Sequence, residues 1–399
     1  MALDGDRYLR PIVASNSTSR PREPASVTDD ERTQLFSRIC PGVFLRAPDG
    51  PNAKGIFGRY EAAFSAYATD AETRKTGSSG GVLTALQQYL VAEQGKRVIA
   101  AGPDSQEPTK SAGVVIASAS ELRRSVGSRY APVSSLDNRE VFSKDTVFVG
   151  KPCEASPLAQ ICKHMNRQAP ITLSFFCAGT PSQEATNDVL QSLGCRADAV
   201  TSLRYRGDGW PGRFTATTDT QQLSMSYEES WGQFLGRDVQ WRCKLCVDGT
   251  GADADVSVGD FWSVDERGYP VFRDADGLSV AVARTPRGLT LLKDATEAGY
   301  IRIEEIDLER VVAVQPLQRD RKRTLIARLA GRRLARRAVP RYRGYGLWTH
   351  QVRSVKDAPR ALVRTLVRSR QTAPDGGELS RLSRVQETTA LPGRESSER

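Results

Sequence analysis

The sequence predicts an α/β protein with a mixed, largely parallel sheet core and flanking helices, a loop-rich second subdomain that carries a CxxC motif, and an Arg-rich helical C-terminal tail. Three observations support this fold class. Strand-like and helix-like segments alternate through the middle of the chain and include two similar strand–turn–helix units. After about residue 205 the sequence changes to Gly- and Trp-rich loops. From about residue 305 it becomes helical and rich in arginine.

The length and composition are enough for two ordinary domains, since the chain has 399 residues of which 39% are hydrophobic. Both ends are polar and lack periodicity, so we expect them to be disordered. The expected organisation is a disordered N-terminus (1–30), an N-terminal domain (31–150), a C-terminal domain (151–318), a basic helical tail (319–370) and a disordered C-terminus (371–399).

Hydrophobic periodicity predicts the individual elements. The clearest helix spans residues 82–95, where apolar side chains recur at helical spacing and Gly95 supplies the stop. In the two strand–turn–helix units, further helices are expected at residues 157–165 and 183–194. Strands are expected at residues 97–101, 113–119, 146–150, 171–176, 254–262 and 278–285.

The composition excludes several classes of chemistry. Only two histidines are present, His164 and His350, and both have basic or polar neighbours, which argues against Ser-His-Asp hydrolysis and His-rich metal sites. No stretch approaches the roughly 18 apolar residues that a membrane span needs. The first thirty residues contain no apolar leader segment, so we expect a reducing, cytoplasmic location, where thiols serve as metal ligands or nucleophiles.

The positive charge of the chain is concentrated in its tail. The net charge is +10, yet residues 319–370 alone contain seventeen Lys and Arg against two Asp, so the rest of the chain is acidic overall. Such a segment can dock a partner protein, contact an anionic membrane surface, bind nucleic acid or present a solvated helix face. Nucleic acid is not the expected partner.

Four of the seven cysteines form a candidate metal site. Cys243 and Cys246 make a CxxC, and the following DGTG offers no helix that would activate a redox dithiol. Cys153 and Cys177 each follow a strand, and two adjacent parallel strands would present both thiols at one edge of the sheet. Four thiolates suit either a 4Fe-4S cluster or structural zinc, and spacing alone leaves both open.

The remaining cysteines have simpler interpretations. Cys162 shares a helix with apolar residues and is expected to be a small buried hydrophobe, and Cys195 is expected to be structural. Cys40 is more than a hundred residues from any other cysteine and is expected to be a bystander. The carboxylates around the predicted strand beside the CxxC are expected to be solvated strand ends; they are Asp253, Asp255 and Asp260.

Two further motifs can bind a cofactor. TGSSGG, from Thr76 to Gly81, precedes the clearest helix, so its amides, its serines and the helix dipole can hold a phosphate; a plain capped helix is the alternative. GWPG places Trp210 in a tight turn, where its indole can lie on a flat ring or form a packing corner.

Taken together and in this order, the segments TGSSGGVLTALQQYL, GSRYAPVSS, VGKPCEASPLAQ, FFCAGTPS, YRGDGWPG and RCKLCVDGTGADADVSVGDFW resemble the coenzyme F420 hydrogenase/dehydrogenase beta-subunit family. The resemblance runs from about Thr76 to about Val314. It implies an iron-sulfur flavoprotein oxidoreductase that transfers hydride and electrons between coenzyme F420, FAD and a 4Fe-4S cluster. The two expected domains would then carry the flavin phosphate loop and the cluster ligands, respectively.

The resemblance also implies roles for individual residues. The cluster ligands would be Cys153, Cys177, Cys243 and Cys246. The residues lining FAD would be Gly77, Ser78, Ser79, Gly80, Gly81 and Thr84, with Arg129 and Tyr130 beside it. Hydride transfer itself needs no protein base, so no catalytic residue is assigned.

One departure from the family limits what the chain does alone. Relatives with an N-terminal ferredoxin-like module carry CxxCxxCxxxCP, of which only Cys40-Pro41 is present here. Electrons would therefore pass to a redox partner protein or to a small-molecule substrate, and the donor can be F420 or ferredoxin. The alternatives are a zinc-stabilised protein that binds nucleic acid or a partner through its basic tail, and a degenerate subunit that keeps the fold as a scaffold.

Overall fold

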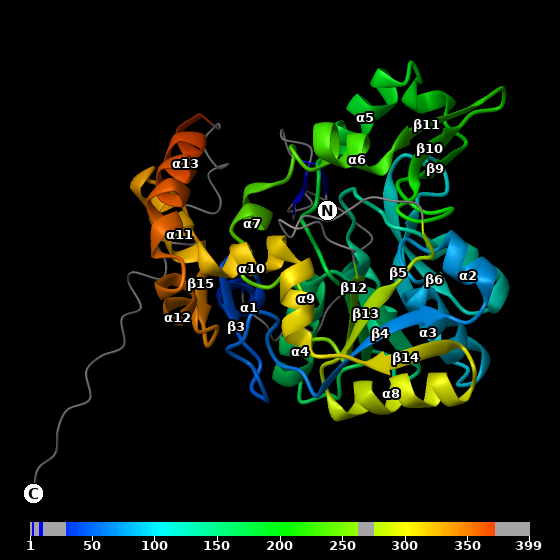
Figure 1. Ribbon diagram of the computed structural model, residues 1–399, viewed down its shortest axis with the longest axis horizontal. Helices are drawn as coiled ribbons and strands as arrows, with labels where there is room; N and C mark the ends of the chain where they lie inside the picture. The colour runs from blue at the N-terminus through cyan, green and yellow to red at the C-terminus, as the bar shows by residue number, and fades with distance from the viewer. Residues whose placement is uncertain (1, 4–7, 11–28, 262–274, 372–399) are drawn as a thin grey trace, which may run out of the picture.

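The computed structural model describes residues 2–3, 8–10, 29–261 and 275–371 (Figure 1). The expected disordered ends lie outside the described residues, apart from residues 2–3, 8–10, 29–30 and 371. The first of these residues form two short paired strands, β1 (Ala2–Leu3) and β2 (Leu9–Arg10).

A central sheet of eight strands in the order β14-β4-β13-β12-β8-β7-β5-β6 organises the described residues (Figure 1). Its four middle strands, β5, β7, β8 and β12, run parallel to one another, and antiparallel strands flank them on both sides. The predicted α/β class is thereby confirmed. The strands are β4 (Ala62–Ala68), β5 (Arg97–Pro103), β6 (Ser111–Ile116), β7 (Thr146–Gly150), β8 (Ile171–Phe175), β12 (Val256–Asp260), β13 (Ser279–Ala283) and β14 (Ile301–Glu305).

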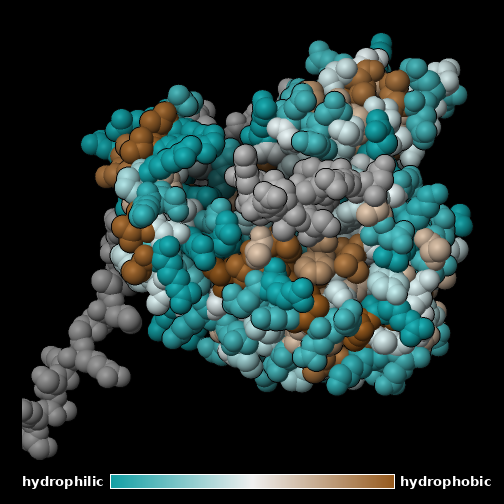
Figure 2. Space-filling view, viewed as in Figure 1, coloured by the Kyte–Doolittle hydropathy of each residue, from teal (hydrophilic) through white to brown (hydrophobic). Residues whose placement is uncertain are grey.

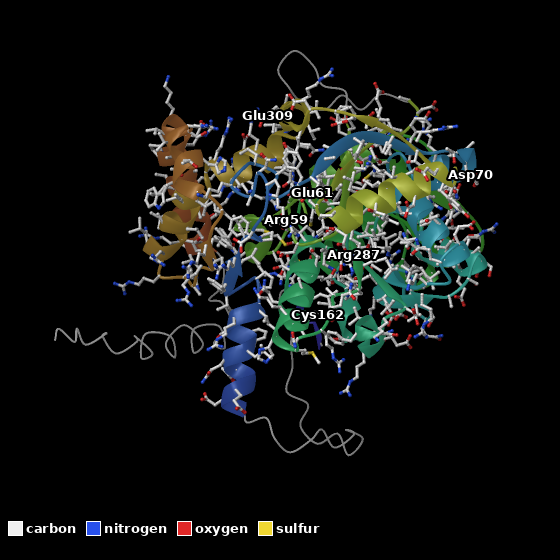
Figure 3. All side chains as sticks on the ribbon, turned by 90° about the horizontal axis from the view of Figure 1, so that it is seen from below. Arg59, Glu61, Asp70, Cys162, Arg287 and Glu309 are labelled. Atoms are coloured by element: carbon white, nitrogen blue, oxygen red, sulfur yellow. The ribbon has the colours of Figure 1, made fainter. Side chains whose placement is uncertain are left out.

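Both faces of this sheet are covered by helices, which is why its middle strands are buried on both faces and are rich in apolar residues. Successive residues of β7 show this directly, because Val147 and Val149 belong to one core cluster and Phe148 to another. Helices α3 (Val82–Ala92) and α8 (Pro286–Glu297) cover the first face; α4 (Pro152–His164) and α9 (Leu308–Val314) pack on the other. Cys162 on α4, labelled in Figure 3, has a buried thiol that packs in the same core cluster as Phe148, as expected for a small buried hydrophobe.

The helices begin at residues that satisfy their first backbone N–H groups. Ser182 caps α5 (Gln183–Ser192), and Thr285 caps α8, each accepting a hydrogen bond from an N–H of the first turn. Helix α4 begins differently, since Pro152 opens it and the Glu154 carboxylate accepts a hydrogen bond from the N–H of Lys151. This local chemistry fixes where the chain turns from β7 into α4.

A small second subdomain lies at one end of the central sheet (Figure 1). Its antiparallel sheet contains β9 (Ser202–Arg204), β10 (Arg213–Thr217) and β11 (Gln222–Ser226), and packs with α5 around a separate core that includes Tyr205 and Phe214. The predicted later strands do not belong to it, because β12 and β13 are buried on both faces and pair within the central sheet. The two expected domains therefore share one sheet.

The basic tail folds against the core (Figure 1). Its strand β15 (Arg341–Arg343) pairs in parallel with β3 (Phe44–Arg46). Leu325 and Tyr345 of the tail are buried in one cluster with Leu45 and Val247. Its helices are α10 (Pro316–Arg323), α11 (Leu325–Leu334), α12 (Leu347–Val352) and α13 (Ala358–Gln371). The remaining elements are α1 (Asp29–Ile39), α2 (Ala71–Thr76), α6 (Tyr227–Glu229), α7 (Trp241–Lys244), a π-helical turn (Ser230–Leu235) and short 3-10 turns at 119–125, 135–137, 139–142, 197–199 and 355–357.

A fully buried arginine joins the loop after the CxxC to the sheet. The guanidinium of Arg284 donates hydrogen bonds to the carbonyl oxygens of Phe57, Arg59 and Thr250 and to the hydroxyl of Ser257. Burial lowers the pKa of Arg284 to about 10, so it stays charged at neutral pH. Three loop carbonyls accept hydrogen bonds from this one side chain, and that of Phe57 also accepts one from the Thr250 hydroxyl.

We expect Arg284→Met to lower the free energy of unfolding by about 3 kcal/mol, because it leaves buried carbonyl oxygens without donors. Urea denaturation followed by circular dichroism measures the change. The matched control is Arg302→Gln on the exposed side of β14, for which the expected change is within about 0.5 kcal/mol. Equal stability of the two variants would contradict the structural role of Arg284.

Candidate functional site

The four cysteines singled out in the sequence converge in the structure. Cys153, Cys177, Cys243 and Cys246 all line one small cavity of about 20 Å³. Cys153 lies in the first turn of α4, Cys177 follows β8, Cys243 lies on α7 and Cys246 comes just after it. Residues separated by up to 93 positions in the sequence, from Cys153 to Cys246, therefore line one cavity.

The sheet register explains why the first two thiols meet. Strands β7 and β8 are parallel neighbours in which Val149 pairs with Leu173 and Gly150 with Ser174. Their carboxyl ends therefore lie at the same edge of the sheet, as predicted. The only difference is that Cys153 belongs to the helix rather than to the turn, because Pro152 starts α4 immediately after Lys151.

The sulfur atoms lie in a buried environment with positive charge around it. Burial raises the pKa of Cys177 and raises that of Cys246 to about 12. The pKa of Cys153 is also raised by burial, and the positive charges of Arg242 and Lys151 oppose the shift. Arg321 acts in the same way on Cys177 and Cys246. A group that binds all four as thiolates would be stabilised by these cations.

Four thiols that line one cavity can ligate either a single metal ion or a polynuclear cluster. Within the described residues, no group of three or more His, Cys, Asp or Glu side chains is arranged to hold one metal ion. Zinc needs each sulfur at about 2.3 Å from a common centre. A 4Fe-4S cluster binds each cysteine through a different iron atom, so its four sulfurs surround a larger group.

A second, larger cavity of about 500 Å³ opens beside the first. The ends of all four parallel strands line it, with Ala101 from β5, Gly150 from β7, Phe175 from β8 and Asp260 from β12. Its volume falls in the usual range for small-molecule and cofactor sites, about 300–1,000 Å³. Its position at the carboxyl edge of parallel strands is where open α/β sheets bind ligands.

The two cavities share part of their walls. Cys177, Gly179 and Thr180 line both of them. The backbone N–H of Thr180 donates a hydrogen bond of 3.4 Å to the sulfur of Cys243, so this shared segment also contacts the CxxC. A flat ring system in the larger cavity and a metal group in the smaller one would be separated by a single short stretch of chain.

Most of the residues expected at a cofactor line the larger cavity. They are Gly77, Ser78, Ser79, Gly81, Thr84, Arg129 and Tyr130. Gly80 is turned toward the sheet, where its N–H donates a hydrogen bond of 2.9 Å to the hydroxyl of Ser279. Trp210 is buried outside the cavity lining, with the Arg206 guanidinium 4.8 Å from its ring centroid.

Arg129 serves mainly as a structural link at the cavity wall. Its guanidinium donates hydrogen bonds to the hydroxyl of Ser111 and to the carbonyl oxygens of Pro108, Lys110 and Leu203. These bonds join the β5–β6 hairpin to the second subdomain. The side chain thus holds the cavity open between two parts of the fold.

Several charged side chains at the larger cavity go beyond those expected from the sequence. Arg206 is 2% exposed, forms an ion pair of 2.8 Å with Asp260, and lies against the ring of Tyr227. Lys151 and Glu154 form a second ion pair of 2.8 Å near Cys153. Arg206 belongs to the motif YRGDGWPG, and Lys151 and Glu154 belong to VGKPCEAS. Lys151 and Glu154 are close in the sequence, but nothing in YRGDGWPG indicates the partner of Arg206, which lies 54 positions away.

The carboxylates near β12 are not solvated as expected. Asp255 is 5% exposed and pairs with Arg287 at 2.5 Å, and Asp260 pairs with Arg206. Asp255 also accepts a hydrogen bond from the N–H of Thr172, which ties β12 to the start of β8. The sequence pattern placed these residues at strand ends but did not show that arginines would reach them.

The loop after the CxxC folds around a pair of acidic side chains. The Asp248 carboxylate accepts hydrogen bonds from the N–H groups of Thr250, Gly251 and Ala252. Asp253, also expected to be solvated, lies half-buried nearby; its Oδ2 has no hydrogen-bond partner among the described residues, and burial together with the charge of Asp248 raises its pKa to about 7. This carboxyl is therefore largely protonated in the folded protein below neutral pH.

Two family models match this chain, and both are described as coenzyme F420 hydrogenase/dehydrogenase, beta subunit. The model for the N-terminal part of that protein matches residues 63–138, and the model for its C terminus matches residues 143–309. All four cysteines lie within the second match.

Characterised proteins are similar over the same region. Coenzyme F420 hydrogenase subunit beta of Methanococcus voltae is 24% identical over 262 residues, which cover 63% of this chain and 86% of the relative. Coenzyme F420-dependent sulfite reductase of Methanocaldococcus jannaschii is 25% identical over 271 residues, which cover 62% of this chain and 39% of that protein. A chain in the structure of the F420-reducing [NiFe] hydrogenase complex from Methanosarcina barkeri has the same fold, with a TM-score of 0.50 and 20% identity over 68% of this chain and 95% of that one.

The raised pKa of Asp253 predicts a pH dependence of stability. The folded protein holds this proton up to about pH 7, whereas the unfolded chain releases it near its ordinary pKa of 3.8. The stabilisation is therefore complete below about pH 4 and is lost as the pH rises to 7, with a slope of at most about 1.4 kcal/mol per pH unit.

Asp253→Asn should remove this contribution, so that the free energy of unfolding falls less between pH 4 and 7 than in the wild-type protein. Urea denaturation at several pH values measures the slope. Asp219→Asn, in the exposed turn between β10 and β11, should retain the wild-type slope. If Asp253→Asn leaves the change of unfolding free energy with pH as it is in the wild-type protein, the Asp253 carboxyl is ionised in the folded state.

Proposed function

The chain belongs to the coenzyme F420 hydrogenase/dehydrogenase beta-subunit family, and from this premise we propose that it is an F420-dependent oxidoreductase that uses FAD and one 4Fe-4S cluster. The observation that carries the proposal is the wall at Cys177 shared by the four-cysteine cavity and the larger cavity. When bound, the flavin supplies exchange between hydride and single electrons, and the cluster supplies one-electron transfer. The shared wall would place the flavin and the cluster next to each other.

The residues of the chain would hold these groups in place. Cys153, Cys177, Cys243 and Cys246 would ligate the cluster, with Arg242, Arg321 and Lys151 balancing its negative charge. Ser78, which precedes α3, offers its hydroxyl group and the nearby positive end of the helix dipole to the flavin phosphates. Ser79 lines the same cavity, but its own hydroxyl donates a hydrogen bond to the carbonyl oxygen of Leu278. The ends of the parallel strands line the larger cavity.

The charged pairs of the larger cavity would orient its ligands. Arg206 is fixed by Asp260 and lies between the rings of Trp210 and Tyr227, so its guanidinium cannot swing freely. Lys151 is fixed by Glu154 in the same way. Fixed cations that line a cavity favour anionic ligands at defined positions. No histidine occurs among the described residues that line this cavity, which suits a hydride transfer without a protein base.

A redox partner protein is the proposed destination of the electrons. The outer face of the C-terminal helices presents apolar side chains beside arginines, as the brown areas over α11 and α13 in Figure 2 show. On α13, Val363 is 54% and Val367 47% exposed, with Arg360 and Arg364 on neighbouring turns. Such a surface is complementary to a partner with an acidic rim and an apolar centre. Contact of this tail with an anionic membrane surface stays a prediction, and no helix in the described part of the chain is long and apolar enough to span a membrane.

The wall that the four-cysteine cavity shares with the larger cavity favours the redox function over a zinc-stabilised binding protein, which has no need of such a wall. The four sulfurs surround a cavity, and no set of ligands around a single ion position occurs in the part of the chain that the structure describes. Much of the basic tail is also engaged with the core, which leaves less of it for nucleic acid.

The four-cysteine assignment predicts the iron content of variants. Cys177→Ala should lose most of the bound iron and the visible absorbance of the cluster, because Cys177 lies between the two cavities and provides one of only four thiolates. Iron and sulfide analysis after anaerobic purification measures the loss. Cys162→Ala and Cys195→Ala, which remove buried thiols outside the cavity, should retain about four iron atoms per chain. Equal iron loss in all three variants would contradict the assignment of Cys177 as a cluster ligand.

Anaerobic titration tests the proposed activity directly. Reduced F420 should bleach the flavin absorbance of the purified protein and then reduce the cluster, detected by electron paramagnetic resonance. A protein that is colourless even after reconstitution with iron, sulfide and FAD would refute the proposal. Bleaching by reduced ferredoxin and not by F420 would leave the flavoprotein assignment standing and replace the electron donor.

A further inference from the structure

We propose that the segment from α10 to β15 is an integral part of the metal site, a cap that closes the four-cysteine cavity, with Arg321 and Tyr342 as its positioning residues. This segment lies beyond residue 309, where the second family match ends. The inference rests on the proposed function, because it concerns how the chain holds the cluster. It gives the basic tail a role that its sequence did not indicate.

The cap contacts the segment that both cavities share. The Gln318 amide donates a hydrogen bond of 3.3 Å to the carbonyl oxygen of Cys177, and the Arg321 guanidinium donates one of 2.8 Å to that of Ala178. Both side chains are nearly buried, with exposed fractions of 4% and 5%. Two side chains of α10 therefore fix the adjacent carbonyl groups of Cys177 and Ala178.

The cap also contacts the CxxC segment. The Tyr342 hydroxyl donates a hydrogen bond of 2.6 Å to the carbonyl oxygen of Leu245, and Arg328 donates one of 3.4 Å to that of Lys244. These two carbonyls belong to the residues between Cys243 and Cys246. The guanidinium of Arg332 also lies 4.3 Å from the ring centroid of Trp241 at the start of α7.

Both positioning residues line the four-cysteine cavity itself. The close approach of the cap is visible at Gly249, where an added Cβ would lie 2.1 Å from Gln318 Oε1 and 2.7 Å from Arg321 Nη1. The opposite side of the cap is anchored by the pairing of β15 with β3, just after Pro41, which also lines the cavity. The cap is thus held in place at both of its ends, by the contact of α10 with Gly249 and by the pairing of β15 with β3.

Two consequences follow for a bound cluster. Arg321 brings a positive charge beside Cys177 and Cys246, which favours the reduced, more negative state and raises the reduction potential. Tyr342 holds the backbone between the CxxC thiols, which slows opening of the site and loss of iron. Groups that orient metal ligands in this way typically change metal affinity by about 10–100-fold when removed.

Separate variants test these two effects. Arg321→Gln should shift the reduction potential of the cluster to more negative values, and Arg321→Lys should restore much of the potential because it keeps the charge. Tyr342→Phe should release iron to a chelator about 10-fold faster with little change in potential. The measurements are a redox titration followed by electron paramagnetic resonance and the rate of iron transfer to a coloured chelator.

Arg333→Gln is the matched control, because Arg333 is an exposed arginine on α11 of the same segment. It should leave both the potential and the rate of iron release unchanged. If Arg321→Gln and Tyr342→Phe behave like Arg333→Gln, the cap has no role at the metal site, and the proposed function stands without it. A wild-type protein that binds no cluster after reconstitution would instead refute the proposed function itself.

Discussion

Parallel pairing of β7, β8 and β12 is the constraint on which the site depends. Because these strands run in the same direction, their carboxyl ends meet at one edge. Cys177 lies two residues after the end of β8, and Asp260 is the last residue of β12. Parallel strands need crossover connections, and α4 supplies one of them while bringing Cys153 to the same edge. The loop with the CxxC then closes over this edge, held by Asp248 from within and by Arg284 from the sheet.

The parts of the fold that were predicted correctly have a strong local signal. The helix at 82–92 has a complete apolar stripe, and β7 and β8 are short apolar runs, because both of their faces are buried. The edge strand β14 and its neighbour β4 were not predicted. The sequence IRIEE of β14 contains three charged residues in five, and AAFSAYA of β4 is rich in alanine, so neither forms the apolar run that marks the middle strands.

The candidate site shows the same division. Cysteines are rare enough that their spacing predicted a shared site, and the structure brings all four together. The ion pair of Arg206 with Asp260 joins residues 54 positions apart, and no periodicity in either segment indicates the contact. The basic tail is the clearest case, because a high content of arginine shows charge but not location. Arg321 and Arg332 are buried against the core, whereas Arg333 faces solvent.

The pairing of β3 with β15 has a consequence for biosynthesis. The cavity that contains the four thiols is lined by residues from Pro41 to Tyr342, so it is incomplete until most of the polypeptide has left the ribosome. A metal centre placed in the finished cavity is therefore inserted after translation of the tail. A chain shortened before β15 would lack Tyr342 in the wall of this cavity and the strand that pairs with β3, so its four thiols would be less enclosed.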